Sequence, residues 1–343
     1  MPDRKLKQEG EFQENAAFPL NVRKFIIKTG TDASLNIKKD ATNLYFVTPP
    51  YCIDVCLQEI IIENVWRQIM RNYFKGMYFK CQSDTQTLAI IPSVHEVLGK
   101  RFYSLQVITE DGAWYTRIKD LENQCFEEKV LELNIDTSKV KATGKLYFTN
   151  SIPLKYDIMG PFSLIPFMEC RHSVYSMLHQ VNGLICINDK EYVFENAYGY
   201  WEGDSGRSFP KEYAWTHSFI EGKDGVIAGS LMLSVADIPL AGLHFMGIIG
   251  IVLWKGKEYR FATYLGARVI QKEKGVLLIR QRSMELEARL LEQMPHPLQA
   301  PVNGAMQRTI HENITCKAFY RFRIQGVTQF AFETDKASFE YEY

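Results

Sequence analysis

The sequence predicts an all-β protein of the sandwich or barrel type. Short runs of β-branched and aromatic residues recur from residue 73 onward, and turn-forming residues separate them. Two pairs of runs have the spacing of hairpins, namely 184–187 with 192–194 and 250–254 with 258–261. The chain has 343 residues, 46% of them hydrophobic, which suits roughly two domains or one large β domain with a substantial core.

The N-terminal part of the chain differs from the rest. Residues 1–18 are charged and poor in apolar side chains, which predicts a mobile tail. After Pro49 and Pro50, apolar residues recur at helical spacing over 53–65. An amphipathic helix is expected there, although the run 60–62 also suits a strand.

The later part of the chain contains further strand candidates and one helical pattern. Strands are also expected at 144–148 and 316–322, two short runs rich in aromatic residues. The strongest helical pattern covers 283–292, and the same segment also suits a strand followed by a loop. Pro295 and Pro297 end this element in either case.

Charge and cysteine content exclude several classes of protein. Forty basic and forty acidic residues cancel, which argues against a dedicated nucleic-acid surface. Seven cysteines without a Cys-x-x-Cys pair indicate reduced thiols, and the polar N-terminus is unlike a signal peptide. The longest apolar region, 229–254, is interrupted by Asp237, Pro239 and His244, so we expect buried strands in a soluble, cytoplasmic protein with at most peripheral membrane contact.

The segment 199–210 carries the strongest functional signal. It combines Tyr200 and Trp201 with two carboxylates, Glu202 and Asp204, and three glycines and a proline interrupt it. Aromatic faces beside acids can bind a flat apolar molecule and protonate it. The same composition also fits a structured loop whose aromatic rings are core and whose charges are paired.

Five segments, in order along the chain, resemble the tocopherol cyclase family. The central one runs from Gly199 to Pro210 and leads into an aromatic-rich strand at 213–218. The other four segments are 73–80, 158–162 together with 166–172, 259–264, and 300–306.

This resemblance implies a fold of two lipocalin-like β-barrel halves side by side, of the hydroxyneurosporene synthase and tocopherol cyclase type. It implies an N-terminal extension over residues 1–65, a first half over 66–180 and a second half over 181–343, joined near 150–185. Barrels of this size can hold one small apolar ligand in the mouth or lumen.

The resemblance also implies an activity. The reaction of the family closes a chromanol ring: an acid protonates an alkene of a prenylated quinol, and the phenol oxygen captures the tertiary cation. We therefore expect a tocopherol cyclase-like protein that binds a prenylated quinol or other isoprenoid in an apolar barrel cavity, without a cofactor. Two alternatives remain open: a lipocalin-like carrier of a hydrophobic ligand without turnover, and a structural protein whose barrels are filled by their own side chains.

Asp204 is the first candidate for the acid, and Glu202 is the second. Asp204 can act as a donor if Arg207 is turned away, whereas a bond between the two side chains would only fix the loop. Tyr200 and Trp201 would supply aromatic faces toward a cation, although strand alternation could send one of them to the core.

A second group of candidates lies on neighbouring strands. Glu169 and His172 follow an apolar run, but residues three apart on a strand point to opposite faces, so a direct pair would need a bulge. Trp215 and His217 share one face of an extended strand, and either His172 or His217 could instead be a hydrogen-bonded core histidine. The seven histidines lack metal-binding spacing, so no metal site is expected.

The chain departs from the family pattern within the motifs themselves. Lys75 and Met77 stand where the family commonly has an acid and a tryptophan, and Gly203 and Ser205 flank Asp204 in an altered central run. Phe219 replaces a polar residue after the tryptophan strand. These departures are compatible with a cavity that is kept for binding while its chemistry has changed.

Overall fold

The computed structural model describes residues 36–40, 43–47, 72–119, 125–127, 129–165, 168–222, 225–240 and 243–343. The chain forms two compact units, residues 1–62 and 63–343. In the first unit, β1 (Asn36–Asp40) and β2 (Asn43–Val47) pair as an antiparallel hairpin. The tail expected at 1–18 and the helix expected at 53–65 lie outside the described residues.

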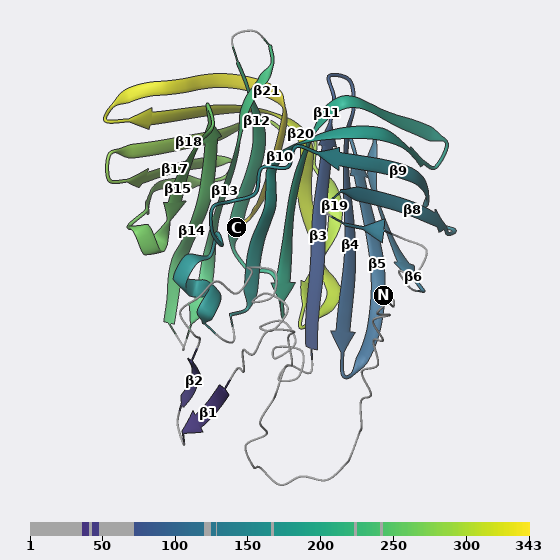
Figure 1. Ribbon diagram of the computed structural model, residues 1–343, viewed down its shortest axis with the longest axis horizontal. Coiled ribbons are helices and arrows are strands. Elements are labelled where there is room, and N and C mark those ends of the chain that lie inside the picture. Colours follow the sequence, from purple (N-terminus) through teal and green to yellow (C-terminus); the bar gives the residue numbers. More distant parts are fainter. Residues whose placement is uncertain are drawn as a thin grey trace, which may run out of the picture. The chain divides into compact units, whose positions relative to one another are not determined.

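The second unit confirms the predicted fold class. It is all-β, with two lipocalin-like halves side by side, each built around one strongly curved antiparallel sheet (Figure 1). The helices in its described residues are two short 3-10 helices, η1 (Gly160–Leu164) and η2 (Thr263–Leu265). Within the described part of the chain, no helix is long and apolar enough to cross a lipid bilayer.

The first sheet has nine strands in the order β6-β5-β4-β3-β11-β10-β9-β8-β7. Neighbouring strands are antiparallel throughout, and β3 joins the N-terminal strands to the long β10–β11 hairpin. The strands are β3 (Asn72–Gln82), β4 (Thr87–Val97), β5 (Lys100–Thr109), β6 (Gly112–Ile118), β7 (Cys125–Phe126), β8 (Val130–Asp136), β9 (Lys141–Thr149), β10 (Cys170–Ile187) and β11 (Lys190–Gly206).

The second sheet has ten strands. Nine of them follow the order β15-β14-β13-β12-β21-β20-β18-β17-β16, and β19 also pairs with β20. The strands are β12 (Tyr213–Glu221), β13 (Ile227–Leu240), β14 (Leu243–Trp254), β15 (Lys257–Ala262), β16 (Arg268–Glu273), β17 (Val276–Gln281), β18 (Met284–Glu292), β19 (His296–Val302), β20 (Ala305–Ile324) and β21 (Val327–Glu342).

The chain passes from the first sheet to the second through residues 207–212. The division expected between residues 180 and 181 therefore falls inside β10. The segment between β9 and β10 links two strands of the first sheet, yet it contacts the second: the Lys155 backbone N–H donates to Glu258 Oε2.

Both predicted hairpins are present. Ile187 pairs with Lys190, and Trp254 pairs with Lys257, so each hairpin has a two-residue turn. In the second turn both central residues have positive φ, 50° and 72°, as a type I′ turn requires, which explains the glycine at the second position. The strands expected at 144–148 and 316–322 lie within β9 and β20.

The helical interpretation of 283–292 is wrong, because this segment forms strand β18. Its composition favours a helix, but β18 pairs on one side with β17 and on the other with β20. Two full ladders of backbone hydrogen bonds and the burial of Leu286 and Ala288 outweigh the weak local preference.

Each sheet curls around a hydrophobic core of its own, and a third cluster fills the space between the sheets. Strand β11 shows how this arises. Tyr192 and Phe194 face the core of the first sheet, whereas Tyr200 faces the third cluster, because an irregularity in the β10–β11 register between Phe194 and Ala197 reverses the alternation. The outer face of each sheet thus meets the other sheet, and this layer carries the site described next.

Candidate functional site

A cavity of about 170 Å³ lies in the layer between the two sheets. Its walls come from β3, β10 and β11 on one side and from β12–β14 and β19–β21 on the other, while Met159, Phe162 and Met168 from the β9–β10 segment close one end. An apolar cavity of about 150 Å³ accepts a benzene-sized molecule. The cavity expected inside a barrel is therefore found between the two halves, because their outer faces carry the apolar side chains.

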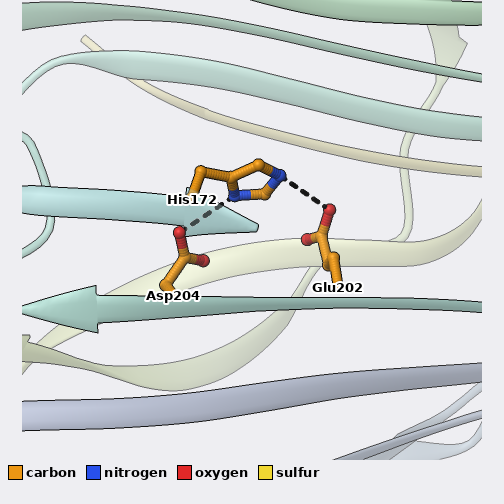
Figure 2. A group of neighbouring side chains, drawn as sticks. All are labelled: His172, Glu202 and Asp204. Atoms are coloured by element: carbon orange, nitrogen blue, oxygen red, sulfur yellow. Dashed lines mark hydrogen bonds and ion pairs between the residues drawn. The ribbon is translucent and has the colours of Figure 1, made fainter. Parts of the chain in front are cut away.

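His172 bridges two carboxylates in the wall of this cavity. Its Nδ1 donates to Asp204 Oδ1 at 2.9 Å, and its Nε2 lies 3.2 Å from Glu202 Oε2 (Figure 2). His172 and Asp204 are direct neighbours across β10 and β11, and Glu202 occupies the next position on the same face of β11. We call these three residues the His172 bridge.

The charge on the His172 bridge follows from its surroundings. Burial lowers the pKa of His172, but the Glu202 and Asp204 carboxylates outweigh this effect and hold the pKa well above its usual value. The imidazole is therefore protonated at neutral pH. Two carboxylates around one imidazolium leave a net negative charge at this point of an otherwise apolar wall.

Aromatic side chains surround Glu202. The Tyr200 hydroxyl and the Trp215 Nε1–H both donate to Glu202 Oε2, the latter at 3.2 Å. Tyr200 in turn stacks on His217 with ring centroids 3.9 Å apart, and Trp215 and His217 share one face of β12 as predicted. Burial holds the pKa of His217 well below its usual value, so this ring is neutral. Its contribution is the stacking contact that fixes the Tyr200 ring.

Arg207 does not fix Asp204. Its guanidinium donates to Asn303 Oδ1 at 3.1 Å, while Asp204 Oδ1 accepts from His172 and, at 3.6 Å, from Cys170 Sγ. The arrangement under which Asp204 was the preferred acid is thus present. Its nearest partner, however, is the His172 imidazolium, so Asp204 accepts a hydrogen bond and has no proton of its own to donate in this geometry.

Glu169 lies outside the bridge. Its backbone carbonyl accepts from the N–H groups of Arg207 and Ser208, which anchors the chain as it leaves β11. Burial raises the pKa of its half-buried carboxyl, against the opposing effect of Arg207. The structure therefore pairs His172 with Asp204 and Glu202 instead of with Glu169, since two-residue spacing on β11 keeps both acids on one face.

Trp201 requires a correction, because it faces away from the cavity. Its ring stacks on Phe79 at 5.0 Å and lies 4.6 Å from the Tyr175 ring, next to the core of the first sheet. Trp201 is one residue from both Tyr200 and Glu202, so alternation sends it to the opposite face. Gly203 points the same way, as a Cβ there would meet the Tyr175 ring at 3.1 Å.

These positions predict different effects for two tryptophans. Trp215→Phe removes part of the apolar wall of the cavity and should weaken binding of a neutral apolar probe, N-phenyl-1-naphthylamine, by roughly fivefold, the equivalent of about 1 kcal/mol for about 40 Å² of lost apolar contact. Trp201→Phe should leave the Kd unchanged, as measured by fluorescence titration. Equal weakening by both substitutions would contradict the assignment of the two faces.

Two acids that the sequence analysis missed also line the cavity. Glu312 and Glu340 are 3% and 7% exposed, on β20 and β21. A signal was present in the sequence: Ile310, Glu312 and Ile314 share one face of a strand by two-residue spacing, which places an acid on an apolar face.

The donor atoms of the His172 bridge lie within 4.8 Å of one another, close enough to consider a metal ion. The two carboxylates, however, contact opposite nitrogens of one imidazole ring (Figure 2). An ion bound to one nitrogen at about 2.0–2.1 Å would leave the other carboxylate beyond bonding distance. The geometry fits a charge-assisted bridge better than one coordination sphere.

No family model and no curated protein matches this chain. Three solved structures are similar over most of their length. They are an AttH protein from Nitrosomonas europaea (11% identity, TM-score 0.42, 80% of this chain and 93% of that one), CghA (9%, 0.48, 79% and 88%) and kievitone hydratase from Nectria haematococca (7%, 0.43, 80% and 89%). At these identities and TM-scores, none of the three bears on what this chain does.

Proposed function

We propose that this protein binds a neutral, largely apolar small molecule between its two sheets and closes a ring in it by acid-catalysed addition to an alkene. A quinol with a short prenyl group carries the required alkene and phenol, and its ring is of the benzene size that a cavity of about 170 Å³ accepts. The observation that supports this proposal is the His172 bridge, a net negative group in the wall of an apolar cavity.

The arrangement suits a reaction that passes through a carbocation. Protonation of the alkene creates a tertiary cation, which the ring faces of Trp215 and Tyr78 and the negative charge of the bridge would stabilise. The phenol oxygen then bonds to the cationic carbon. The proton of the phenol hydroxyl then passes to a carboxylate of the His172 bridge, which lines the cavity.

A carrier of a hydrophobic ligand is the second candidate. Apolar side chains form most of the cavity wall, and a carrier needs little more than such a surface with a few polar groups. The His172 bridge would then serve only to hold β10 and β11 together.

Turnover in D₂O distinguishes the two candidates. The protein should convert a prenylated quinol into an isomer that carries one deuterium on carbon, detected by mass spectrometry. Asp204→Asn should reduce turnover by ~10²–10⁴-fold, the usual scale for losing a group that handles a proton. His244→Gln is the control, because it alters an exposed histidine–aspartate pair away from the bridge.

Two other results would count against ring closure. Binding of the quinol without any isomer would favour the carrier, and the absence of both binding and turnover would contradict both candidates.

A further inference from the structure

Glu312 and Glu340 form a pair of carboxyls in the cavity wall. They are direct partners across β20 and β21, and their side chains lie on the same face of the sheet. Side chains opposite each other on antiparallel strands have Cβ atoms about 4.5–5.5 Å apart. Both residues line the cavity, and Glu340 is also the strand neighbour of Trp215 on β12.

The polar partners of this pair are phenols. Tyr78 donates its hydroxyl to Glu312 Oε1 at 2.6 Å, and Tyr213 donates to Glu340 Oε1. Burial holds the pKa of each phenol well above its usual value, so both tyrosines are neutral and do not change the net charge of the pair.

Among the described residues, no cation forms an ion pair with Glu312 or Glu340. Lys80 lowers the pKa of Glu312 and Arg308 lowers the pKa of Glu340, in both cases by less than burial raises it. The Lys80 ammonium donates to the Lys336 carbonyl at 3.2 Å, and Arg308 donates to the Pro210 carbonyl at 2.9 Å. Two further acids have the opposite effect: Glu202 raises the pKa of Glu312, and Glu342 raises the pKa of Glu340.

Two carboxyls in this position cannot both be ionised. Like charges at directly opposed strand positions of a buried site disfavour each other's ionisation, so one group keeps its proton. Burial raises the pKa of Glu312 to about 7, and burial together with the neighbouring Glu312 holds the pKa of Glu340 well above its usual value. At least one carboxyl of the pair thus carries a proton at neutral pH.

We propose that the Glu312–Glu340 pair, and not Asp204, is the proton donor of the cavity. This inference rests on the proposed ring closure and divides the chemistry between two centres. The pair belongs to the second sheet and supplies the proton, while the His172 bridge belongs to the first sheet and accepts one.

The step balances without an oxidant or a cofactor. The O–H bond of the pair breaks, and a C–H bond forms on the alkene. The phenol oxygen then bonds to the tertiary carbon, and its O–H proton moves to a carboxylate of the His172 bridge. The product is an isomer of the substrate, and exchange with water returns one proton to the pair and removes one from the bridge.

The double substitution Glu312→Gln with Glu340→Gln tests this inference. It keeps the shape of both side chains and removes the acidic protons, so turnover should fall by ~10²–10⁴-fold while the Kd for the quinol stays within twofold. Glu110→Gln is the matched control, because burial also raises the pKa of Glu110, which lies outside the cavity wall. In the unmutated protein, kcat should decline in alkaline solution, because the pair loses its protons as the pH rises above about 7.

An infrared measurement supplies a readout that needs no turnover. At pH 7 the unmutated protein should show the carbonyl stretch of a protonated carboxyl, and the double variant should lose it. A double variant that keeps full turnover, or the same carboxyl band, would overturn the assignment of the donor while ring closure stands. An unmutated protein that forms no isomer from any prenylated quinol would remove ring closure and, with it, this inference.

Discussion

Replacing His172 with glutamine is expected to lower the free energy of unfolding by about 3–5 kcal/mol, the usual cost of breaking a buried ion pair from one side. Glu202 is only 5% exposed, and the imidazolium is the cation beside it. Glutamine keeps N–H donors on a single nitrogen but carries no charge, so it cannot neutralise either carboxylate. Urea unfolding at pH 6 measures the loss.

The chain provides a control for this experiment. His244 and Asp237 form the same kind of pair, with Nδ1 and Oδ2 2.8 Å apart, but the His244 side chain is 63% exposed. His244→Gln should therefore cost less than about 1 kcal/mol. A similar loss for both substitutions would show that the bridge is not held by buried charge.

The pH dependence of the same variant has a defined sign. The folded protein holds the pKa of His172 well above the unfolded value of about 6.5. The stability that the proton provides is therefore fully present below about pH 6.5 and is lost as the pH rises through the folded pKa. The difference between the unmutated protein and His172→Gln should narrow in alkaline solution.

Replacing Arg260 with methionine should have a comparable effect, about 3–5 kcal/mol, for a different reason. Arg260 is 6% exposed, and its guanidinium binds Glu258 at 2.9 Å. It also donates to the carbonyls of Tyr156 and Asp157 at 2.8 Å each. Methionine fills the space of the stem but leaves the Glu258 charge without a cation and two carbonyls without a donor.

This substitution should also loosen the segment between β9 and β10, which Arg260 ties to β15. Amide hydrogen exchange over residues 150–165 should become faster, while exchange in β20 stays slow. Arg280→Met is the control. Arg280 is exposed, so its ion pair with Glu285 should contribute less than about 1 kcal/mol to stability. Unchanged exchange in 150–165 would contradict the anchoring role of Arg260.

The sequence predicted the fold class because its signals were local. The hairpin turns at Asn188 and at Lys255 can be identified from a few neighbouring residues, and both are present. β18 was harder, since its composition favours a helix and only its two strand partners decide the outcome. Its partner on β20 lies up to 40 residues away in the sequence, so residues 283–292 themselves do not reveal that pairing.

The sequence analysis named some of the residues that line the cavity but not the contacts between them. His172, Glu202 and Asp204 were all named from the sequence, yet only the register of β10 against β11 shows that one histidine joins the two acids. Trp201 and Tyr200 could not be separated without knowing which face of β11 meets the second sheet. Glu312 and Glu340 come together only through the pairing of β20 with β21.

The position of the cavity between two separately filled cores has a consequence for how this protein can change. Residues such as Trp215 and Ile238 border the cavity, whereas the packing inside each half depends on other side chains of the same strands. Substitutions at apolar wall positions such as Ile238 can thus reshape the space for a ligand while the core inside each half keeps its packing. Charged wall residues such as His172 are different, because they also contribute to stability.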